Sequence, residues 1–195
     1  MRVIKGKAKG RRLKVSKGLD IRPTSDKVKE SVFNITGDKI DGAVFLDLCA
    51  GIGNVGIEAA SRGAKEIAFV ESNQKAVKLI KENLLLCHLE EDSNVIFSDA
   101  VKFLKTTEGK FDIIFFDPPY RSGLLQDALA VFEKKEMLNP DGILIVEHLS
   151  RTILSEKIGG LILLKKYKYG DTTLSLYKRK EGLHEKKDCC VSGDI

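Results

Sequence analysis

The sequence lacks several features that mark common functional classes. No apolar run approaches the roughly 20 residues of a membrane span, and the first residues, MRVIKGKAKGRR, contain no apolar core of a signal peptide. We therefore expect a cytoplasmic protein. The three histidines do not cluster with the cysteines, and no pair of cysteines has metal-ligand spacing, which predicts reduced thiols and no zinc site. The cysteines are Cys49, Cys87, Cys189 and Cys190.

Length and composition predict one domain with extensions. A chain of 195 residues with 43% hydrophobic content can bury a single core. We expect a basic arm over residues 1–19 and one folded domain over residues 20–180. Residues 181–195 contain few apolar side chains and are expected to form a disordered tail.

Positive charge is concentrated in the arm. The net charge is +5, yet eight basic residues precede the first acid, Asp20. A solvated basic arm is one interpretation, and binding of a phosphate backbone is the other. Alternating character at residues 2–5 and 11–15 predicts a basic β-hairpin. The candidate RNA-binding residues are Arg2, Lys5, Lys7, Lys9, Arg11 and Arg12.

Strand and helix patterns alternate along the domain. The expected strands cover residues 43–48, 67–70, 95–97, 111–116 and 143–147, and the last follows a predicted turn at residues 139–142. Helices are expected between them, and one more precedes them, capped by Thr24 or Ser25 and closed by Gly37. Two final strands, at residues 161–169 and 172–178, form a hairpin. The pattern predicts an α/β fold with a doubly wound, mostly parallel seven-stranded sheet.

The segment IIFFDPPY, at residues 113–120, ends an apolar strand with an acid, two prolines and an aromatic residue. Proline lacks an N–H group and restricts the residue before it, so Asp117 should lie at the carboxyl end of the strand. Ligands of open parallel sheets bind at this edge. A strand-ending turn with a surface tyrosine is the simpler alternative. The candidate substrate site comprises Asp117, Pro118, Pro119 and Tyr120.

A glycine loop follows the first expected strand. Gly51, Gly53 and Gly56 match G-x-G-x-x-G, and Glu71 lies 20 residues after Gly51, as in a nicotinamide-dinucleotide site. Against that interpretation, Asp47 would face the pyrophosphate with like charge. The loop also suits S-adenosylmethionine, whose sulfonium and ammonium groups would attract Asp47. The spacing alone leaves both cofactors open.

Four acids, Asp47, Glu71, Asp99 and Asp117, lie at the ends of four successive expected strands. Any one of them could be a helix N-cap or a rim carboxylate. Together they predict a cleft in which Glu71 accepts hydrogen bonds from ribose hydroxyls and Asp99 accepts one from the adenine amino group.

On these motifs the sequence resembles the class I S-adenosylmethionine-dependent methyltransferases, which have a Rossmann-like sheet with a reversed last strand. Over residues 2–178 it is similar to the bacterial family that methylates the N2 amine of guanine in 16S, small-subunit rRNA. One departure is Cys49, where a larger aromatic side chain is expected. The resemblance rests on MRVIKGKAKGRRL, RPTSDKVKESVFNI, LDLCAGIGNVGIEAASRGA, FVES, FFDPPY and YGDTTLSLYKR.

The resemblance implies S-adenosylmethionine as cofactor and ribosomal RNA, the small subunit or its assembly intermediate as partner. It implies no membrane or metal, and we expect a monomer. The cofactor-binding residues carried over are Asp47, Ala50, Gly51, Gly53, Glu71, Asp99, Ala100, Arg22 and Thr24.

The implied chemistry is methylation of an exocyclic amine whose lone pair is delocalised into the base. The Asp117 carboxylate and the Pro118 carbonyl would accept the two amino hydrogens, and Tyr120 would stack on the flipped-out base. Three alternatives stay open: adenine-N6 methylation of DNA or RNA, a nicotinamide-dependent oxidoreductase, and a non-catalytic RNA-binding module.

Overall fold

A computed structural model describes residues 1–15, 25–120 and 123–179 of the chain. The strands are β1 (Val44–Leu48), β2 (Glu66–Glu71), β3 (Ser93–Phe97), β4 (Phe111–Phe116), β5 (Leu138–Leu149), β6 (Lys157–Ile158), β7 (Leu161–Tyr169) and β8 (Thr172–Arg179). The helices are α1 (Asp26–Thr36), the 3-10 helix η1 (Gly37–Ile40), α2 (Asn54–Ser61), α3 (Gln74–Cys87), α4 (Ala100–Thr106) and α5 (Leu124–Lys134). The predicted tail and the arm–domain boundary at residues 19–20 lie outside the described residues.

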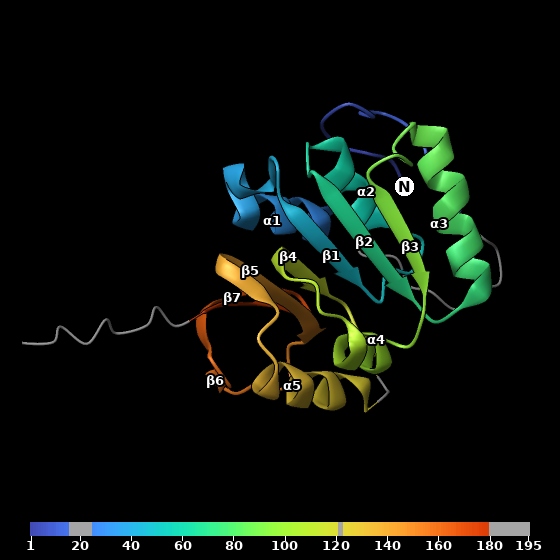
Figure 1. Cartoon of the computed structure of the whole chain (residues 1–195). Helices are drawn as coiled ribbons and strands as arrows, with labels where there is room; N and C mark the ends of the chain where they lie inside the picture. The colour runs from blue at the N-terminus through green and yellow to red at the C-terminus, as the bar shows by residue number, and fades with distance from the viewer. Residues whose placement is uncertain (16–24, 121–122, 180–195) are drawn as a thin grey trace, which may run out of the picture.

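One twisted sheet forms the centre of the molecule (Figure 1). Its order is β3-β2-β1-β4-β5-β8-β7-β6. The five strands from β3 to β5 are parallel, whereas β8 runs antiparallel to both β5 and β7. The predicted doubly wound sheet and its reversed terminal hairpin are therefore confirmed.

Helices bury both faces of the parallel strands. Residues of α1, α2 and α3 join one hydrophobic cluster and residues of α4 and α5 join the other. In β4, Ile113 and Phe115 face the first cluster, and Ile114 and Phe116 face the second. Burial on both sides explains why this strand is apolar without alternation from Ile113 to Phe116.

Polar caps fix where helices begin beside the strand ends. The Asn73 carboxamide accepts hydrogen bonds from Lys75 N at 2.9 Å and Ala76 N at 3.2 Å. Ser25 Oγ accepts one from Val28 N at 3.3 Å, so Ser25 is the N-cap of α1. These bonds satisfy N–H groups that the first helical turn leaves unpaired.

The structure differs from the expected strands at the start of β5. The predicted turn at residues 139–142 is wrong, because these residues belong to β5. Phe111 pairs with Leu138 and Ile113 with Ile143, so β5 accommodates the extra residues as an irregularity in the ladder. Such a bulge tolerates the missing N–H of a proline. The short strand β6 was also not predicted, and it raises the strand count from seven to eight.

The basic arm packs closely on the domain. Its apolar residues Val3, Ala8 and Leu13 are buried. Instead of two hairpin strands, it contains one isolated antiparallel bridge between Arg2 and Arg12. The two segments of the arm do pair, because Val3 N donates to the Arg11 carbonyl at 3.0 Å and Leu13 N to the Met1 carbonyl at 3.2 Å. The pairing stays short because Ile4 N and Lys5 N donate to Glu58 of α2 instead.

Two buried charges hold the arm. Glu58 of α2 accepts hydrogen bonds from Ile4 N at 2.7 Å and Lys5 N at 2.9 Å. Lys29 of α1 donates to the Arg2 carbonyl at 2.8 Å and lies 3.5 Å from Glu58. Both side chains are fully buried, and burial lowers the pKa of Lys29 against the opposing effect of Glu58.

Candidate active site

A pocket of about 450 Å³ opens at the carboxyl ends of the parallel strands. Five acids line it, one from each of five adjacent strands or the residues that follow them. In sheet order from β3 to β5 they are Asp99, Glu71, Asp47, Asp117 and Glu147. The described lining residues include no lysine, arginine or histidine. The pocket therefore favours a cationic ligand over a phosphate-bearing one.

The glycine loop packs against Asp47, the acid in β1. Gly51 and Gly53 have φ angles of 58° and 78°, which disfavour residues with a side chain. Gly56 N donates to Asp47 Oδ2 at 2.8 Å, and a Cβ atom on Gly56 would lie 2.3 Å from the Phe69 ring. The third glycine of the motif thus lets α2 approach the strand and hold this carboxylate.

Burial dominates the electrostatics of Asp47, which is only 2% exposed. It raises the pKa of this carboxyl to about 7, opposed by the Gly56 N–H and reinforced by the negative charge of Glu71. The protonation of Asp47 therefore changes near neutral pH.

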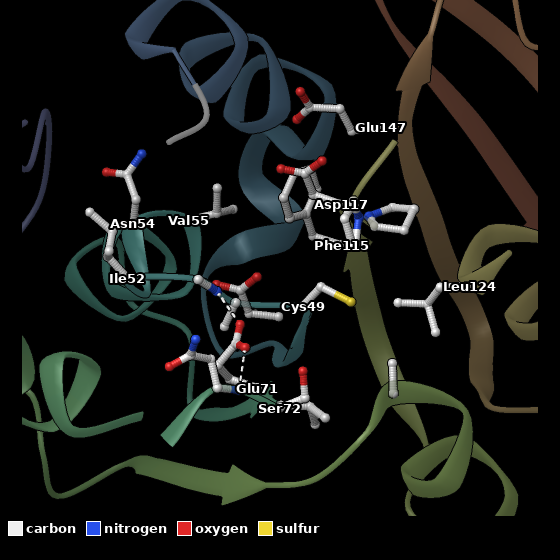
Figure 2. Close-up of a pocket in the computed structure, with 18 of the residues that line it drawn as sticks. Cys49, Ile52, Asn54, Val55, Glu71, Ser72, Phe115, Asp117, Leu124 and Glu147 are labelled. Carbon is white, nitrogen blue, oxygen red and sulfur yellow. Dashed lines mark hydrogen bonds between the residues drawn. The ribbon is translucent and has the colours of Figure 1, made fainter. Parts of the chain in front are cut away.

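Glu71 is the last residue of β2, and its carboxylate binds the glycine loop. Its Oε2 accepts from Gly51 N at 2.8 Å, and its Oε1 accepts from Asn73 N at 2.8 Å (Figure 2). One loop N–H that a pyrophosphate would require is therefore already occupied by a carboxylate. Each carboxylate oxygen has a second lone pair that can accept a hydroxyl, so the arrangement remains compatible with ribose.

Asp99 both caps a helix and lines the pocket. Its Oδ1 accepts from Lys102 N at 2.9 Å, so it caps α4. The residue also lines the pocket beside Ala100 and Ser98. The cap orients the carboxyl group and leaves it at the rim.

The Asp-Pro-Pro-Tyr segment leaves β4 directly into the pocket. Asp117 N still donates to the Leu48 carbonyl at 3.3 Å, which keeps its backbone on the sheet. All four residues of the segment line the cavity. Tyr120 OH donates to Glu147 Oε1 at 3.3 Å and shares a 3.2 Å hydrogen bond with Thr172 Oγ1. The substrate half of the pocket is therefore tied to β5 and β8.

Most predicted cofactor residues converge. Gly53 is an exception: it does not line the pocket and instead precedes α2, packed against Ile57 and Ile80. Arg22 and Thr24 lie outside the described residues. The six arm residues predicted to bind RNA do not line the pocket and are exposed. The lining residues that the sequence did not single out as site residues include Ser25, Asn54, Glu147 and Thr172.

Cys49 lies half-buried in the pocket wall with a φ of 68°. Burial first, and the surrounding carboxylates second, raise the pKa of its thiol. The thiol therefore stays protonated and is a poor nucleophile.

Membrane-spanning helices and metal-ligand clusters are both absent from the described residues. No helix in that part of the chain is long and apolar enough to cross a membrane. Among the same residues, no group of three or more histidines, cysteines or acids could hold a metal ion.

The reversed β8, the glycine loop and the row of acids define a class I methyltransferase, the class that uses S-adenosylmethionine. A solved structure titled "Putative methyltransferase yhhF from Escherichia coli" superposes with a TM-score of 0.80 at 30% identity, covering 93% of this chain and 99% of that one. Residues 1–178 match the model described as Conserved hypothetical protein 95, and the chain belongs to that family.

Two curated relatives match this chain over nearly the whole of their own length. "Putative rRNA methyltransferase YlbH" of Bacillus subtilis is 42% identical over 183 residues, 92% of this chain and 100% of the relative. Ribosomal RNA small subunit methyltransferase D of Haemophilus influenzae is 33% identical over 180 residues, 86% of this chain and 93% of the relative. The family match over residues 1–178 covers the arm and the sheet together.

Proposed function

We propose that this protein transfers a methyl group from S-adenosylmethionine to the exocyclic N2 amine of a guanine in small-subunit ribosomal RNA. The observation that carries the proposal is the Asp117–Tyr120 segment, which lies at the end of β4 in a pocket lined by acids. The names of the relatives support ribosomal RNA as the substrate.

The pocket suits the cofactor by its chemistry. Its carboxylates match the ammonium and sulfonium charges and the ribose hydroxyls, and its apolar lining at Ile52, Val70 and Leu124 can contact the adenine ring. Asp47, Glu71 and Asp99 would hold the amino-acid, ribose and adenine parts, respectively. When bound, S-adenosylmethionine supplies a methyl group on a positively charged sulfur.

The chain's own residues would prepare the amine. The Asp117 carboxylate and the Pro118 carbonyl accept the two amino hydrogens, which directs the nitrogen lone pair towards the methyl group. Positive charge develops on nitrogen as the N–C bond forms and the S–C bond breaks, and Asp117 stabilises it. The surplus proton leaves the nitrogen for solvent. Tyr120 holds the base by stacking.

The substrate class can be tested with labelled S-adenosylmethionine. The protein should label small subunits or their stripped RNA and leave DNA unlabelled. Label in DNA alone would contradict the proposal. RNA binding without label in any substrate form would instead favour a non-catalytic module.

The arm is expected to contribute much of the RNA affinity. Replacing Lys9, Arg11 and Arg12 with glutamine should weaken RNA binding and reduce the salt slope, log K against log salt, by about 2 to 3. All three side chains are exposed, so the fold should be retained. The control variant replaces Lys102, Lys105 and Lys110, which are exposed on and just after α4. An equal slope in both variants would contradict the assignment.

Cofactor binding is expected to depend on pH through Asp47. The fold raises its pKa from 3.8 to about 7, so its stabilising contribution to the apo protein is fully present below the unfolded value and is lost as pH rises through about 7. A cationic cofactor prefers the ionised carboxylate. Affinity for S-adenosylmethionine should therefore rise between about pH 5.5 and 7, approaching tenfold per unit. Calorimetry should show this for wild type, whereas an equally steep profile in Asp47→Asn would contradict it.

A further inference from the structure

Five acids line the pocket, and Glu147 is the one to which the proposed function gives neither a cofactor contact nor a contact with the N2 amine. It lies near the end of β5, next to β4 in the sheet, where Phe116 pairs with Val146. Asp117 and Glu147 each follow that last pair, so they lie side by side at the carboxyl ends of the parallel strands, although Glu147 still pairs with Leu174 of β8. Figure 2 shows both carboxyl groups at one end of the pocket, with Glu71 at the other.

Burial and a hydrogen bond from Tyr120 determine where the Glu147 carboxylate lies in the pocket. The residue is only 5% exposed, yet it lines the pocket. Tyr120 OH donates to its Oε1 at 3.3 Å and is also bonded to Thr172. Burial raises the pKa of Tyr120 to about 12, so the phenol remains a donor at neutral pH. The side chain proposed to stack on the base thus also orients this carboxylate.

The Watson–Crick edge of guanine matches such a pair of acids. Guanine carries an N1–H donor directly beside its N2 amino group, whereas a purine with an unprotonated N1 presents a lone pair there. A carboxylate has about four acceptor sites and no donor. It therefore attracts the N1–H of guanine and repels an N1 lone pair, even while it accepts from Tyr120.

We infer that Glu147 is a specificity-determining residue that selects guanine by accepting its N1–H, while Asp117 and Pro118 hold the N2 hydrogens. The inference rests on the proposed function and supplies what the Asp-Pro-Pro-Tyr segment lacks, since that segment recognises an amino group and not a particular base. A flipped base is read through its Watson–Crick edge in this way.

The test uses RNA in which 2-aminopurine replaces the methylated guanine. This base keeps the N2 amine and has a lone pair at N1. Wild type should prefer guanine in kcat/KM by roughly 10- to 100-fold, the discrimination typical of a good base contact. In Glu147→Gln the preference should fall towards one, because an amide can accept from N1–H or donate to the N1 lone pair. Cofactor affinity should not change.

Glu91→Gln serves as the control, because Glu91 is exposed just before β3, and it should keep the wild-type preference. A purely structural role for Glu147 would slow both substrates equally in Glu147→Gln, and that result would overturn the inference. So would a wild type that methylates both bases equally well.

If Glu147→Gln fails to fold, Tyr120→Phe replaces it, since Tyr120 is 37% exposed. That variant removes the hydroxyl that orients Glu147, so the preference should also shrink, and an unchanged preference would overturn the inference. Failure of the proposed function gives a different result, namely no N2-methylation of guanine by wild type.

Discussion

Asp117→Ala should lower the rate of methyl transfer by about 10²- to 10³-fold, the usual cost of removing one preorganised group that stabilises developing charge. Cofactor affinity should change little, because Asp47, Glu71 and Asp99 supply the proposed polar contacts to the cofactor. Single-turnover label transfer measures the first quantity and calorimetry the second.

The control for this variant is Asp92→Ala, which removes an exposed acid just before β3 and should leave the rate unchanged. Full turnover by Asp117→Ala with intact cofactor binding would remove the role assigned to this carboxylate. Loss of both activity and cofactor binding would mean that Asp117 supports the pocket as a whole.

Glu58→Leu is expected to be the most destabilising single change outside the pocket, by about 3–5 kcal/mol in the free energy of unfolding. The substitution leaves the buried Lys29 with only the longer 3.9 Å ion pair to Asp26. It also removes the 2.8 Å partner of Arg62 and the acceptor for Ile4 N and Lys5 N. Urea denaturation measures the loss. The arm should also become accessible to limited proteolysis.

Two further variants separate the effect of charge pairing on stability from other effects of the Glu58→Leu substitution. Glu82→Gln breaks the exposed ion pair with Lys14 and should cost at most about 1 kcal/mol. The double variant Lys29→Met, Glu58→Leu should be more stable than Glu58→Leu alone, because it removes the uncompensated charge. A double variant with the full sum of both losses would show that packing, rather than charge pairing, holds the arm.

The central sheet was predictable because its signals are local. Apolar runs such as 111–116 alternate with helical periodicity, and parallel neighbours require helical crossovers. The segment at residues 139–142 misled the prediction, since Asn-Pro-Asp-Gly is a strong turn sequence. Its conformation is decided by pairing with β4, which is a property of the folded sheet. The two-residue strand β6 is too short to show the alternation of apolar and polar residues by which a strand is predicted.

The structure places the four predicted acids in one pocket, as their positions at strand ends indicated, and their roles stay predictions. Glu147 already closed an expected strand, so the rule applied to Asp117 would have identified it. No sequence pattern identified Lys29 and Glu58, the two buried charges that hold the arm. Each is a charged residue in a helix, and a sequence alone places such residues at the surface. Their burial depends on an arm more than 20 residues earlier in the chain.

The most direct test is to identify the methylated nucleoside. Small subunits and stripped RNA are incubated with wild-type protein and labelled S-adenosylmethionine, the RNA is digested to nucleosides, and the labelled product is identified by mass spectrometry. We expect N2-methylguanosine from at least one of the two substrates. N6-methyladenosine as the sole labelled product would contradict it.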